Sequence, residues 1–574
     1  MAVTTEGEPR RALPALSLSA YVTFATRSHG RAVAMLVLVS FLAFLPGFFQ
    51  IPPIDRDEAR FAQATKQMIE SGDYVDIRFQ DENRYKKPVG IYWLQAAVVK
   101  TAEFLGLPGA RTTIALYRIP SLLGAVGAVL LTYWTALAFV SRRAAVLAGL
   151  VLATSILLGV EARLAKTDAM LLLTVVAAMG ALGRVYLASL GAHIEMAHRW
   201  IWPAIFWTAT AGGILLKGPL ILMFIGLTAV TLSIFDRSAR WLTGLQPIAG
   251  LLWVLVLVLP WFIAIVAKSG DSFFAQSIGQ DLFAKVGAGQ ESHGAPPGLY
   301  FVLFWVTFWP GSMLAGLAAP AIWKVWREPG AKFLLAWIVP SWIVFEIVLT
   351  KLPHYVLPLY PPIAILAAGI LDHHALSRSR WLEGGTVWWF LIATILALGM
   401  IGVHIVLGEE LGLLAWPFAA GAIIFGLFAW QLFRVDGAER SLLRAMLASI
   451  CIAFAAYGAT FSDLPVLFPA VELADDMRQA NCENPMVATA GYHEPSLVFL
   501  VGTDIVHTTG PGAAEFLNAG GCRFAFVESH QERSFAQRAE ALGLRYASGP
   551  RVEGINISGG RRVSIAVFRA ESPQ

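Results

Sequence analysis

Long apolar runs alternate with short polar stretches over most of the chain. A helix needs about 20 apolar residues to cross the hydrocarbon core of a bilayer, and this criterion predicts thirteen spans. The expected spans are residues 32–51, 119–140, 144–161, 169–188, 201–216, 219–236, 246–267, 299–320, 332–350, 355–371, 386–407, 411–433 and 441–461. We therefore predict a polytopic α-helical membrane protein with its membrane domain at residues 32–463.

Basic residues between the expected spans fall on one side of the predicted membrane. They are Arg27, Arg31, Arg142, Arg143, Arg199, Arg237, Arg240, Lys324, Arg327, Arg378, Arg380, Arg434 and Arg440. Lysine and arginine concentrate in cytoplasmic loops, so this side, with residues 1–31, is expected in the cytoplasm. With an odd number of spans, residues 464–574 then lie on the opposite, outer face.

The polar tail has the pattern of a small α/β domain outside the membrane. Short β-like runs at Met486–Ala490, Phe524–Val527 and Ser564–Phe568 alternate with helix-like stretches. An outer domain lies in an oxidising compartment, where disulfides form. Cys482 and Cys522 could therefore pair, although their spacing gives no distance between them.

Two segments on the outer side interrupt the pattern of spans. Within residues 52–107, apolar positions at helical spacing predict an amphipathic helix over Asp57–Ser71 that ends before Gly72. Residues 88–105 are apolar but contain polar breaks, so we expect an interfacial helix that does not cross. Residues 268–298 form a long loop rich in Gly and Gln, and such loops are usually functional or disordered.

Composition agrees with a membrane protein and excludes other classes. The chain is 57% hydrophobic and 14% charged, against about 25% charged in an ordinary soluble domain. Its net charge of +4 is small, and its basic residues sit in short clusters between apolar runs, so nucleic acid is not an expected partner. Three cysteines without a C-x-x-C motif exclude a zinc ribbon.

A charged run, residues 55–60, follows the first expected span directly. It places three carboxylates and two guanidinium groups at the membrane surface. Acidic residues at the start of a helix commonly act as caps and partners of the helix dipole, and spacing alone leaves that interpretation open. Against it, acids at a lipid boundary are costly unless they are paired or have a function.

This run belongs to a set of outer motifs that resembles one family. The motifs are Asp57–Phe61, Ser71–Tyr74, Tyr85–Leu94, Arg163–Asp168, Leu216–Pro219 and Lys351–Pro358. Together they resemble the bacterial aminoarabinose transferases, lipid A glycosyltransferases of the protein-mannosyltransferase superfamily, which have the GT-C fold. The resemblance covers roughly residues 30–370, and the tail is similar only in kind.

The resemblance implies roles for the acidic residues. Asp57 corresponds to the catalytic carboxylate in the first outer loop, and Glu58, the second acid of the same pair, is a further catalytic candidate. Asp168 corresponds to the second acidic position, in the next outer loop. A carboxylate near the anomeric carbon would favour an oxocarbenium-like transition state.

The resemblance also implies a site for the phosphate of the lipid carrier. Lys87 matches a lysine that contacts this phosphate, and Tyr355 matches a tyrosine near it. A departing polyprenyl phosphate develops negative charge, which Lys87 with Arg60 or Lys217 could stabilise. Lys86 is either a second phosphate contact or a solvated charge. We favour the contact, because adjacent lysines raise the local potential for an anion.

One departure from the family concerns metal binding. Family members commonly have Glu directly before the phosphate-binding lysine, where it can ligate a metal with histidines, but this chain has Lys86 there. His293 and His493 have no obvious carboxylate partner, and for His293 we favour a role in loop structure. Glu161 and Glu346 fall near the outer ends of spans without an assigned role. We therefore predict no metal site and no cofactor.

The leading hypothesis is a polyprenyl-phosphate-sugar dependent glycosyltransferase, either a hexosyl- or a pentosyltransferase. Its acceptor would be lipid A, lipopolysaccharide or another glycolipid on the periplasmic face of the inner membrane. Alternatives are a protein hydroxyl as acceptor, a transporter or flippase of lipid-linked sugars, and an inactive scaffold. Transporters place polar groups near the bilayer midplane, whereas the charged motifs here lie at one face. The intact set of Asp57, Lys87 and Asp168 argues against a scaffold.

Overall fold

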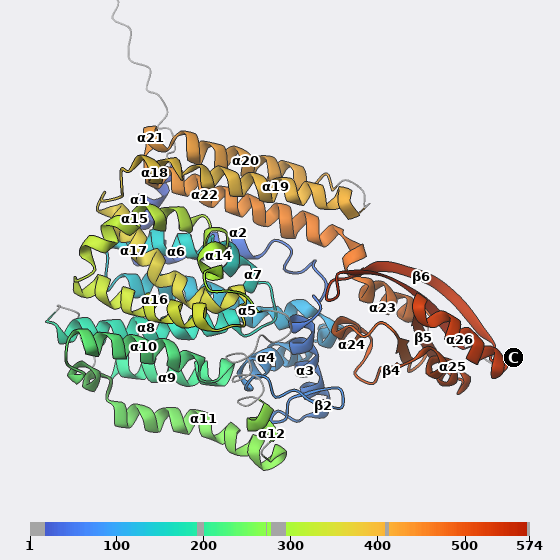
Figure 1. Cartoon of the computed structure of the whole chain (residues 1–574). Coiled ribbons are helices and arrows are strands. Elements are labelled where there is room, and N and C mark those ends of the chain that lie inside the picture. The colour runs from blue at the N-terminus through green and yellow to red at the C-terminus, as the bar shows by residue number, and fades with distance from the viewer. Residues whose placement is uncertain are drawn as a thin grey trace, which may run out of the picture.

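The computed structural model places a bundle of helices beside a smaller C-terminal sheet domain (Figure 1). It describes residues 18–191, 200–270, 272–276, 294–407, 412–480 and 482–570. Helices α3 and α4 of the first outer loop lie between the ends of the bundle helices and the C-terminal domain (Figure 1). The fold therefore has three parts, and the first outer loop touches both of the others.

The bundle consists of apolar helices. They are α1 (Leu18–Ala25), α2 (His29–Phe44), α5 (Ile114–Ala136), α6 (Arg142–Ala153), α7 (Ile156–Glu161), α8 (Asp168–Ser189), α9 (Ile201–Lys217), α10 (Leu220–Phe235), α11 (Pro247–Ser269), α14 (Leu299–Thr307), α15 (Gly311–Val325), α16 (Pro329–Ile347), α17 (Tyr360–Asp372), α19 (Val387–Leu407), α20 (Ala415–Gln431) and α22 (Ala438–Ala453). Short pieces complete it: η2 (Arg240–Leu245), α12 (Ser272–Phe274), η5 (Pro353–Leu359), α18 (Arg380–Gly384), α21 (Phe433–Asp436), the π-helical η6 (Phe454–Thr460), η7 (Phe461–Asp463) and η8 (Pro465–Leu467).

Membrane crossing follows from the length and composition of these helices. Within the described ranges, seven helices are long and apolar enough to span a bilayer, and an eighth span results if α14 and α15 count as one. Several other apolar helices of the bundle are shorter, among them α2, α10 and α20. The protein is a multi-pass membrane protein, and the count of thirteen spans stays a prediction.

Two expected spans are not continuous helices, and whether each crosses the membrane stays a prediction. Residues 299–320 form α14 and α15, whose axes differ by 119°. Pro310 lies at the break, where proline lacks the N–H that a continuing helix needs. Residues 144–161 are divided between α6 and α7. There the hydroxyls of Thr154 and Ser155 donate to the carbonyls of Leu150 and Leu152, each at 2.8 Å, in addition to the backbone N–H groups that these carbonyls accept. The N–H of Ile156 leaves the helix pattern and donates to the carbonyl of Trp309 at 3.3 Å.

The first outer loop contains the helices that the sequence predicts. Helix α3 covers Asp57–Ser71, and Gly72 ends it with a positive φ of 71°, so this prediction is confirmed. The strands β1 (Arg78–Phe79) and β2 (Glu82–Asn83) form a small hairpin. Helix α4 (Gly90–Phe104) has 15 residues, which is too short to cross the hydrocarbon core. The short η1 (Ala110–Thr112) leads into α5.

The C-terminal domain is a five-stranded mixed sheet of order β4-β3-β5-β7-β6. Its elements are α23 (Pro469–Gln479), β3 (Met486–Ala490), α24 (Pro495–Val501), β4 (Val506–Thr508), α25 (Gly510–Asn518), β5 (Arg523–Glu528), α26 (Ser529–Ala541), β6 (Tyr546–Asn556) and β7 (Arg561–Ala570). Strand β3 is parallel to β4 and β5, and β7 is antiparallel to β5 and β6. The predicted α/β domain and its three expected strands are confirmed.

Alternation along the central strand β5 explains why helices cover both faces of this sheet. Phe524 and Phe526 belong to a core with α23 and α24, whereas Ala525 and Val527 belong to a core with α25 and α26. Successive side chains of a strand point to opposite faces. Each face is therefore closed by its own pair of helices, and α24 is left between the sheet and the first outer loop.

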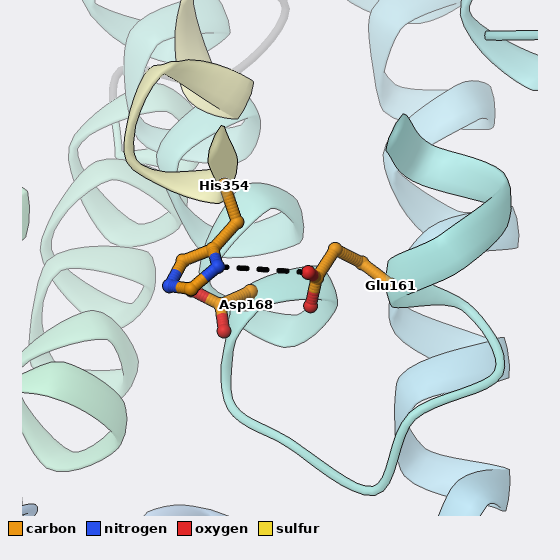
Figure 2. Close-up of side chains that lie close together, drawn as sticks. All are labelled: Glu161, Asp168 and His354. Carbon is orange, nitrogen blue, oxygen red and sulfur yellow. Dashed lines mark ion pairs between the residues drawn. The ribbon is translucent and has the colours of Figure 1, made fainter. Parts of the chain in front are cut away.

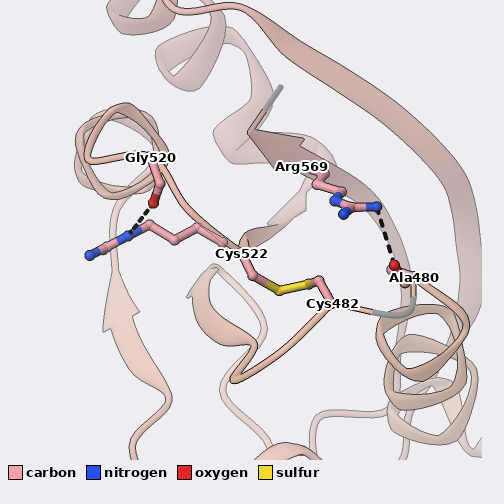
Figure 3. The surroundings of a disulfide bond; sticks show 6 residues. Ala480, Cys482, Gly520, Cys522 and Arg569 are labelled. Carbon is pink, nitrogen blue, oxygen red and sulfur yellow. Dashed lines mark hydrogen bonds between the residues drawn. A yellow bond between two sulfur atoms is a disulfide. The ribbon is translucent and has the colours of Figure 1, made fainter. Parts of the chain in front are cut away.

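Cys482 and Cys522 form a disulfide with their Cα atoms 6.0 Å apart (Figure 3). The predicted pairing is thereby confirmed. Arg569 donates to the carbonyl of Ala480 beside it (Figure 3). The disulfide joins the segments that lead into β3 and β5, two neighbouring parallel strands at the centre of the domain.

Candidate functional site

Charged residues from four outer segments meet near the start of α3. Asp57 opens α3, Asp168 opens α8, Lys217 closes α9, and His354 lies in η5. These segments are far apart in the sequence but adjoin one another at one end of the bundle. Helix starts and ends place side chains at a membrane surface, so the bundle presents a polar site there.

Glu58 is an anchor between the loop and the bundle. Its carboxylate accepts two hydrogen bonds of 2.8 Å from the Arg118 guanidinium, with both side chains 1% exposed. It also accepts the backbone N–H groups of Ile54 at 3.0 Å and Ala165 at 2.9 Å. Both oxygens are thus fully engaged in a bidentate, charge-assisted arrangement. This geometry ties the start of α3 to α5 and to the turn before α8.

Asp57, by contrast, is exposed although it is the next residue to Glu58. The residue before it, Arg56, has a positive φ of 71°, which turns the chain sharply into α3. Burial alone would lower the pKa of the nearby Lys166 ammonium, but the carboxylates of Glu161, Asp168 and Asp57 outweigh this and raise it. The Asp57 carboxylate therefore acts on the same group of charges as Asp168.

The centre of this group, which we name the outer cluster, comprises Glu161, Lys166, Asp168, Lys217 and His354. Lys217 pairs with Asp168, and Lys166 pairs with Glu161 at 3.2 Å. Figure 2 shows the His354 ring beside both carboxylates, with Nδ1 3.7 Å from Glu161 Oε1 and Nε2 3.8 Å from Asp168 Oδ1. All five side chains are at most 13% exposed. The cluster therefore alternates acid and base in a confined space.

The residues expected at the carrier phosphate adjoin the outer cluster. The Lys217 ammonium lies 5.3 Å from the centre of the Tyr355 ring, within the range of a cation–π contact. Lys87 is half-buried and interacts electrostatically with His354. Arg60 lies on the first turn of α3, and Lys86 is exposed beside Lys87. Several cations thus converge on one end of the bundle.

The outer cluster also has the donor types of a metal site. Ligand atoms of Glu161, Asp168 and His354 lie within 4.8 Å of one another. However, the shortest His354 approaches to the two carboxylates use different ring nitrogens, Nδ1 toward Glu161 and Nε2 toward Asp168. The ammonium groups of Lys166 and Lys217 already neutralise both acids. The residues present therefore fit a network of ion pairs better than a divalent cation.

The sequence patterns did not reveal the roles of His354 and Lys166, which had no assigned function. Glu161 was noted only for its position near the end of a span. The available signal was the position of Glu161, Lys166 and His354 near the ends of apolar segments. Ionisable residues at such positions cost free energy unless they have partners. Of the two histidines considered for zinc, His293 lies outside the described residues. His493 belongs to the C-terminal domain, with its ring 4.8 Å from that of His507.

Comparison with curated proteins finds aminoarabinose transferases among the relatives, while no protein-family model matches the chain. The undecaprenyl phosphate-alpha-4-amino-4-deoxy-L-arabinose arabinosyl transferase of Edwardsiella ictaluri is 28% identical over 420 residues, or 71% of each chain. That of Aeromonas hydrophila is 26% identical over 439 residues, covering 70% of this chain and 73% of the relative. For Erwinia tasmaniensis the match is 28% over 326 residues, and it spans only 55% of the relative.

Solved structures give a match over nearly the whole chain. ArnT from Cupriavidus metallidurans bound to undecaprenyl phosphate has a TM-score of 0.73 at 18% identity, covering 96% of this chain and 98% of the other. Its apo structure has a TM-score of 0.72. The chain has the GT-C fold of ArnT. Both the GT-C fold and the relatives expected from the outer motifs are thereby confirmed.

In this GT-C fold, the expected residues fall into three groups. Asp57, Asp168 and Lys217 belong to or act on the outer cluster, with Tyr355 and Lys87 beside it. Glu58 is separated from them by its engagement with Arg118. Arg60 and Lys86 flank the group on the first outer loop.

Proposed function

We propose that this protein transfers a sugar from a polyprenyl-phosphate donor to lipid A or a related glycolipid on the periplasmic face of the bacterial inner membrane. The observation that carries the proposal is the convergence of Asp57, Lys87, Asp168, Lys217 and Tyr355 at one end of the bundle. The curated relatives bear the name of a transferase that uses an undecaprenyl-phosphate sugar. The ArnT structure that it resembles holds undecaprenyl phosphate.

Charge explains how these residues would act on the donor. Breaking the bond between the anomeric carbon and the carrier phosphate leaves negative charge on the phosphate oxygens. Lys87, Arg60 and Lys217, with the exposed Lys86 next to Lys87, would supply positive charge where that negative charge develops. Asp168 holds Lys217 by their ion pair, so it would orient a cation and need not contact the sugar itself.

The sugar side of the reaction requires a carboxylate, and Asp57 meets this requirement. Its side chain is exposed, whereas Glu58 has both oxygens occupied by Arg118 and backbone groups. A carboxylate beside the anomeric carbon stabilises the positive charge of an oxocarbenium-like transition state. The acceptor oxygen then bonds to the anomeric carbon as the bond to the carrier phosphate breaks, the electron pair leaves on that phosphate, and the proton of a hydroxyl acceptor passes to the departing phosphate or to water.

Several features support placing this site on the periplasmic face. The C-terminal domain contacts the first outer loop, so both lie at the same end of the bundle (Figure 1). The Cys482–Cys522 disulfide belongs to that domain, and disulfides form and persist in the periplasm rather than in the cytosol. This agrees with the orientation expected from the basic residues.

Reconstitution tests the proposal. Purified protein in vesicles would receive an undecaprenyl-phosphate aminopentose and lipid A, and mass spectrometry would follow the mass of lipid A. We expect a glycosylated product from the wild type. No product from any lipid A, core or glycolipid acceptor would contradict the proposal, and movement of the donor between leaflets without product would favour a flippase. Lipid analysis of a deletion strain would then identify the natural sugar and acceptor.

A further inference from the structure

The charged residues at the start of α3 are held from opposite sides. Glu58 bonds to Arg118 of the bundle. Asp55 instead accepts the backbone N–H of Ser496 at 2.8 Å, and Arg56 donates to the backbone carbonyl of Ser558. Ser496 and Ser558 both belong to the C-terminal domain. Asp57 therefore lies between one anchor on the bundle and another on the C-terminal domain.

The two receiving groups on the C-terminal domain form one unit. Glu494, just before α24, accepts a hydrogen bond from Asn556 Nδ2 at 2.7 Å and another from Ser558 Oγ at 2.9 Å. Asn556 also accepts the N–H of Gly559 at 2.8 Å, which fixes the turn between β6 and β7. Hydrogen bonds within the C-terminal domain thus join the start of α24 to this turn, independently of the first outer loop. Asp55 and Arg56 therefore contact one connected surface of the domain.

Further contacts hold the rest of α3 against the same domain. Lys66 Nζ donates to the Phe499 carbonyl at 3.0 Å, and Gln63 Nε2 donates to Thr503 Oγ1 at 2.8 Å. The fully buried Phe499 ring also packs against Tyr117 of α5, with 5.2 Å between their centres, so the domain contacts the bundle beside α3 as well. Lys66 and Gln63 follow Asp57 on one helix, so the position of the domain determines the position of that helix.

The backbone at Arg56 shows why the loop needs this support. Its φ of 71° lies in the left-handed region, which costs a non-glycine residue free energy and persists only when the surroundings impose it. The conformation of Arg56 sets the direction of the chain at Asp57, where α3 begins. Removing the domain-side contacts would let Arg56 return to an ordinary conformation and turn Asp57 away.

We infer that the C-terminal domain is part of the catalytic apparatus, with Asp55, Arg56 and their partners Ser496 and Ser558 acting as positioning residues for Asp57. This inference rests on the proposed function, because it assigns Asp57 to the reaction. Lys87 and Lys217 lie outside the contact, so losing it should leave donor binding largely intact. The turnover of bound donor should fall instead, since misplacing a catalytic group by about 1 Å can cost roughly 100-fold.

The experiment compares Arg56→Ala with the wild type in two measurements. Hydrogen–deuterium exchange of the detergent-solubilised full chain reports whether α24 and the β6–β7 turn stay docked. Transfer kinetics in vesicles separate kcat from the KM for donor. We expect Arg56→Ala to raise exchange in both segments and to lower kcat about 10- to 100-fold, with the donor KM changed less than about threefold. Arg551→Ala is the matched control, because Arg551 pairs with Glu532 within the C-terminal domain, and both measurements should stay at wild-type values.

A second pair of variants tests the same contact with a rescue. Asp55→Asn keeps an oxygen that can accept the Ser496 N–H, so it should retain most of the turnover, whereas Asp55→Ala should behave like Arg56→Ala. The two Asp55 variants test the positioning role if Arg56→Ala does not accumulate in the membrane.

The outcomes separate this inference from the proposed function. If exchange rises but kcat is unchanged, the domain does not position Asp57. Lost turnover without a rise in exchange would place Arg56 in contact with substrate and would equally overturn the inference, as would no change in either measurement. A wild type that makes no product would contradict the proposed function, and exchange would still report the docking.

Discussion

The two sides that hold α3 differ in chemistry. On the bundle side, Glu58 and Arg118 form an ion pair with both side chains 1% exposed and with backbone groups filling the remaining positions. On the domain side, single hydrogen bonds join Asp55 to Ser496 and Arg56 to Ser558, and Arg56 is exposed. The bundle attachment is thus a buried, bidentate ion pair, whereas Asp55 and Arg56 bond to backbone groups of the domain. We expect the contact of Asp55 and Arg56 to respond more readily to pH and to substitution.

The largest expected effect is on Asp57, which neither side engages. Asp57→Asn removes a charge at nearly constant volume, and Asn is as good a helix cap as Asp. Transfer should fall by orders of magnitude while thermal stability stays unchanged, because no buried contact is lost. Vesicle assays with purified protein measure the first, and a melting curve in detergent measures the second. Near-normal transfer would move the search for the catalytic carboxylate to Asp55 or Asp168.

Removing the Glu58–Arg118 ion pair on the bundle side should chiefly reduce the stability of the fold. Arg118→Ala leaves the buried Glu58 carboxylate without its partner, and such losses cost about 3–5 kcal/mol. Arg118 also donates to the backbone carbonyls of Phe48, Ile51 and Pro52, so the segment between α2 and α3 loosens as well. We expect a markedly lower melting temperature in detergent. Lys100→Ala offers a control, because Lys100 forms an exposed ion pair with Glu103. Equal melting of both variants would contradict the anchor role.

The stability of the contact between the first outer loop and the C-terminal domain should depend on pH through Asp55. Burial, with a contribution from Glu494, raises the pKa of Asp55 from 3.8 to about 6, although the Ser496 contact and Arg60 oppose it. The docked form therefore binds the proton more tightly than the undocked form. Its stabilisation is complete below pH 4 and is lost as the pH rises through 6, a change on the order of 3 kcal/mol.

Asp55→Asn isolates this pH effect because asparagine does not titrate. The melting temperature of the wild type minus that of Asp55→Asn should increase as the pH is lowered from 7 to 5. Other titrating groups are common to both proteins and cancel in this difference. A difference that stays constant across this range would show that Asp55 titrates as an ordinary exposed carboxylate.

The smallest effect is expected from metal removal. Lys86 stands where the family commonly has a carboxylate, and Lys166 and Lys217 already pair with the acids of the outer cluster. A chelator should leave the transfer rate unchanged, and the purified protein should contain less than one equivalent of zinc by elemental analysis. Activity lost on chelation and restored specifically by zinc would contradict this prediction.

Local patterns predicted the parts of the fold that depend on neighbours in sequence. The spacing of Phe61, Ala64 and Met68, with Gly72 behind them, predicted α3 with its bounds, since these residues share one face of a helix. The strands of the C-terminal domain followed from short apolar runs. The break at Pro310 was also present in the sequence, but the length criterion for spans overrode it.

Contacts between distant residues could not be predicted in this way. Arg118 is 60 residues from Glu58, and Ser496 is 441 residues from Asp55. A single sequence contains no signal for such pairs beyond the presence of costly charges, and Arg118 was passed over at the edge of an expected span. Asp57 and Glu58 are adjacent acidic residues, so the sequence does not distinguish them. The tertiary fold does, because it buries Glu58 against Arg118 and leaves Asp57 exposed.

The position of the C-terminal domain along the chain has a consequence for biogenesis. Ribosomes deliver the chain from its N-terminus, and domains fold as they emerge, so α3 is complete long before Ser496 and Ser558 have been synthesised. During that interval the loop can form its bundle attachment but lacks the domain-side one, and the Cys482–Cys522 disulfide has not yet formed. If Asp57 has the proposed role, a nascent or prematurely terminated chain would present it without its support from the C-terminal domain.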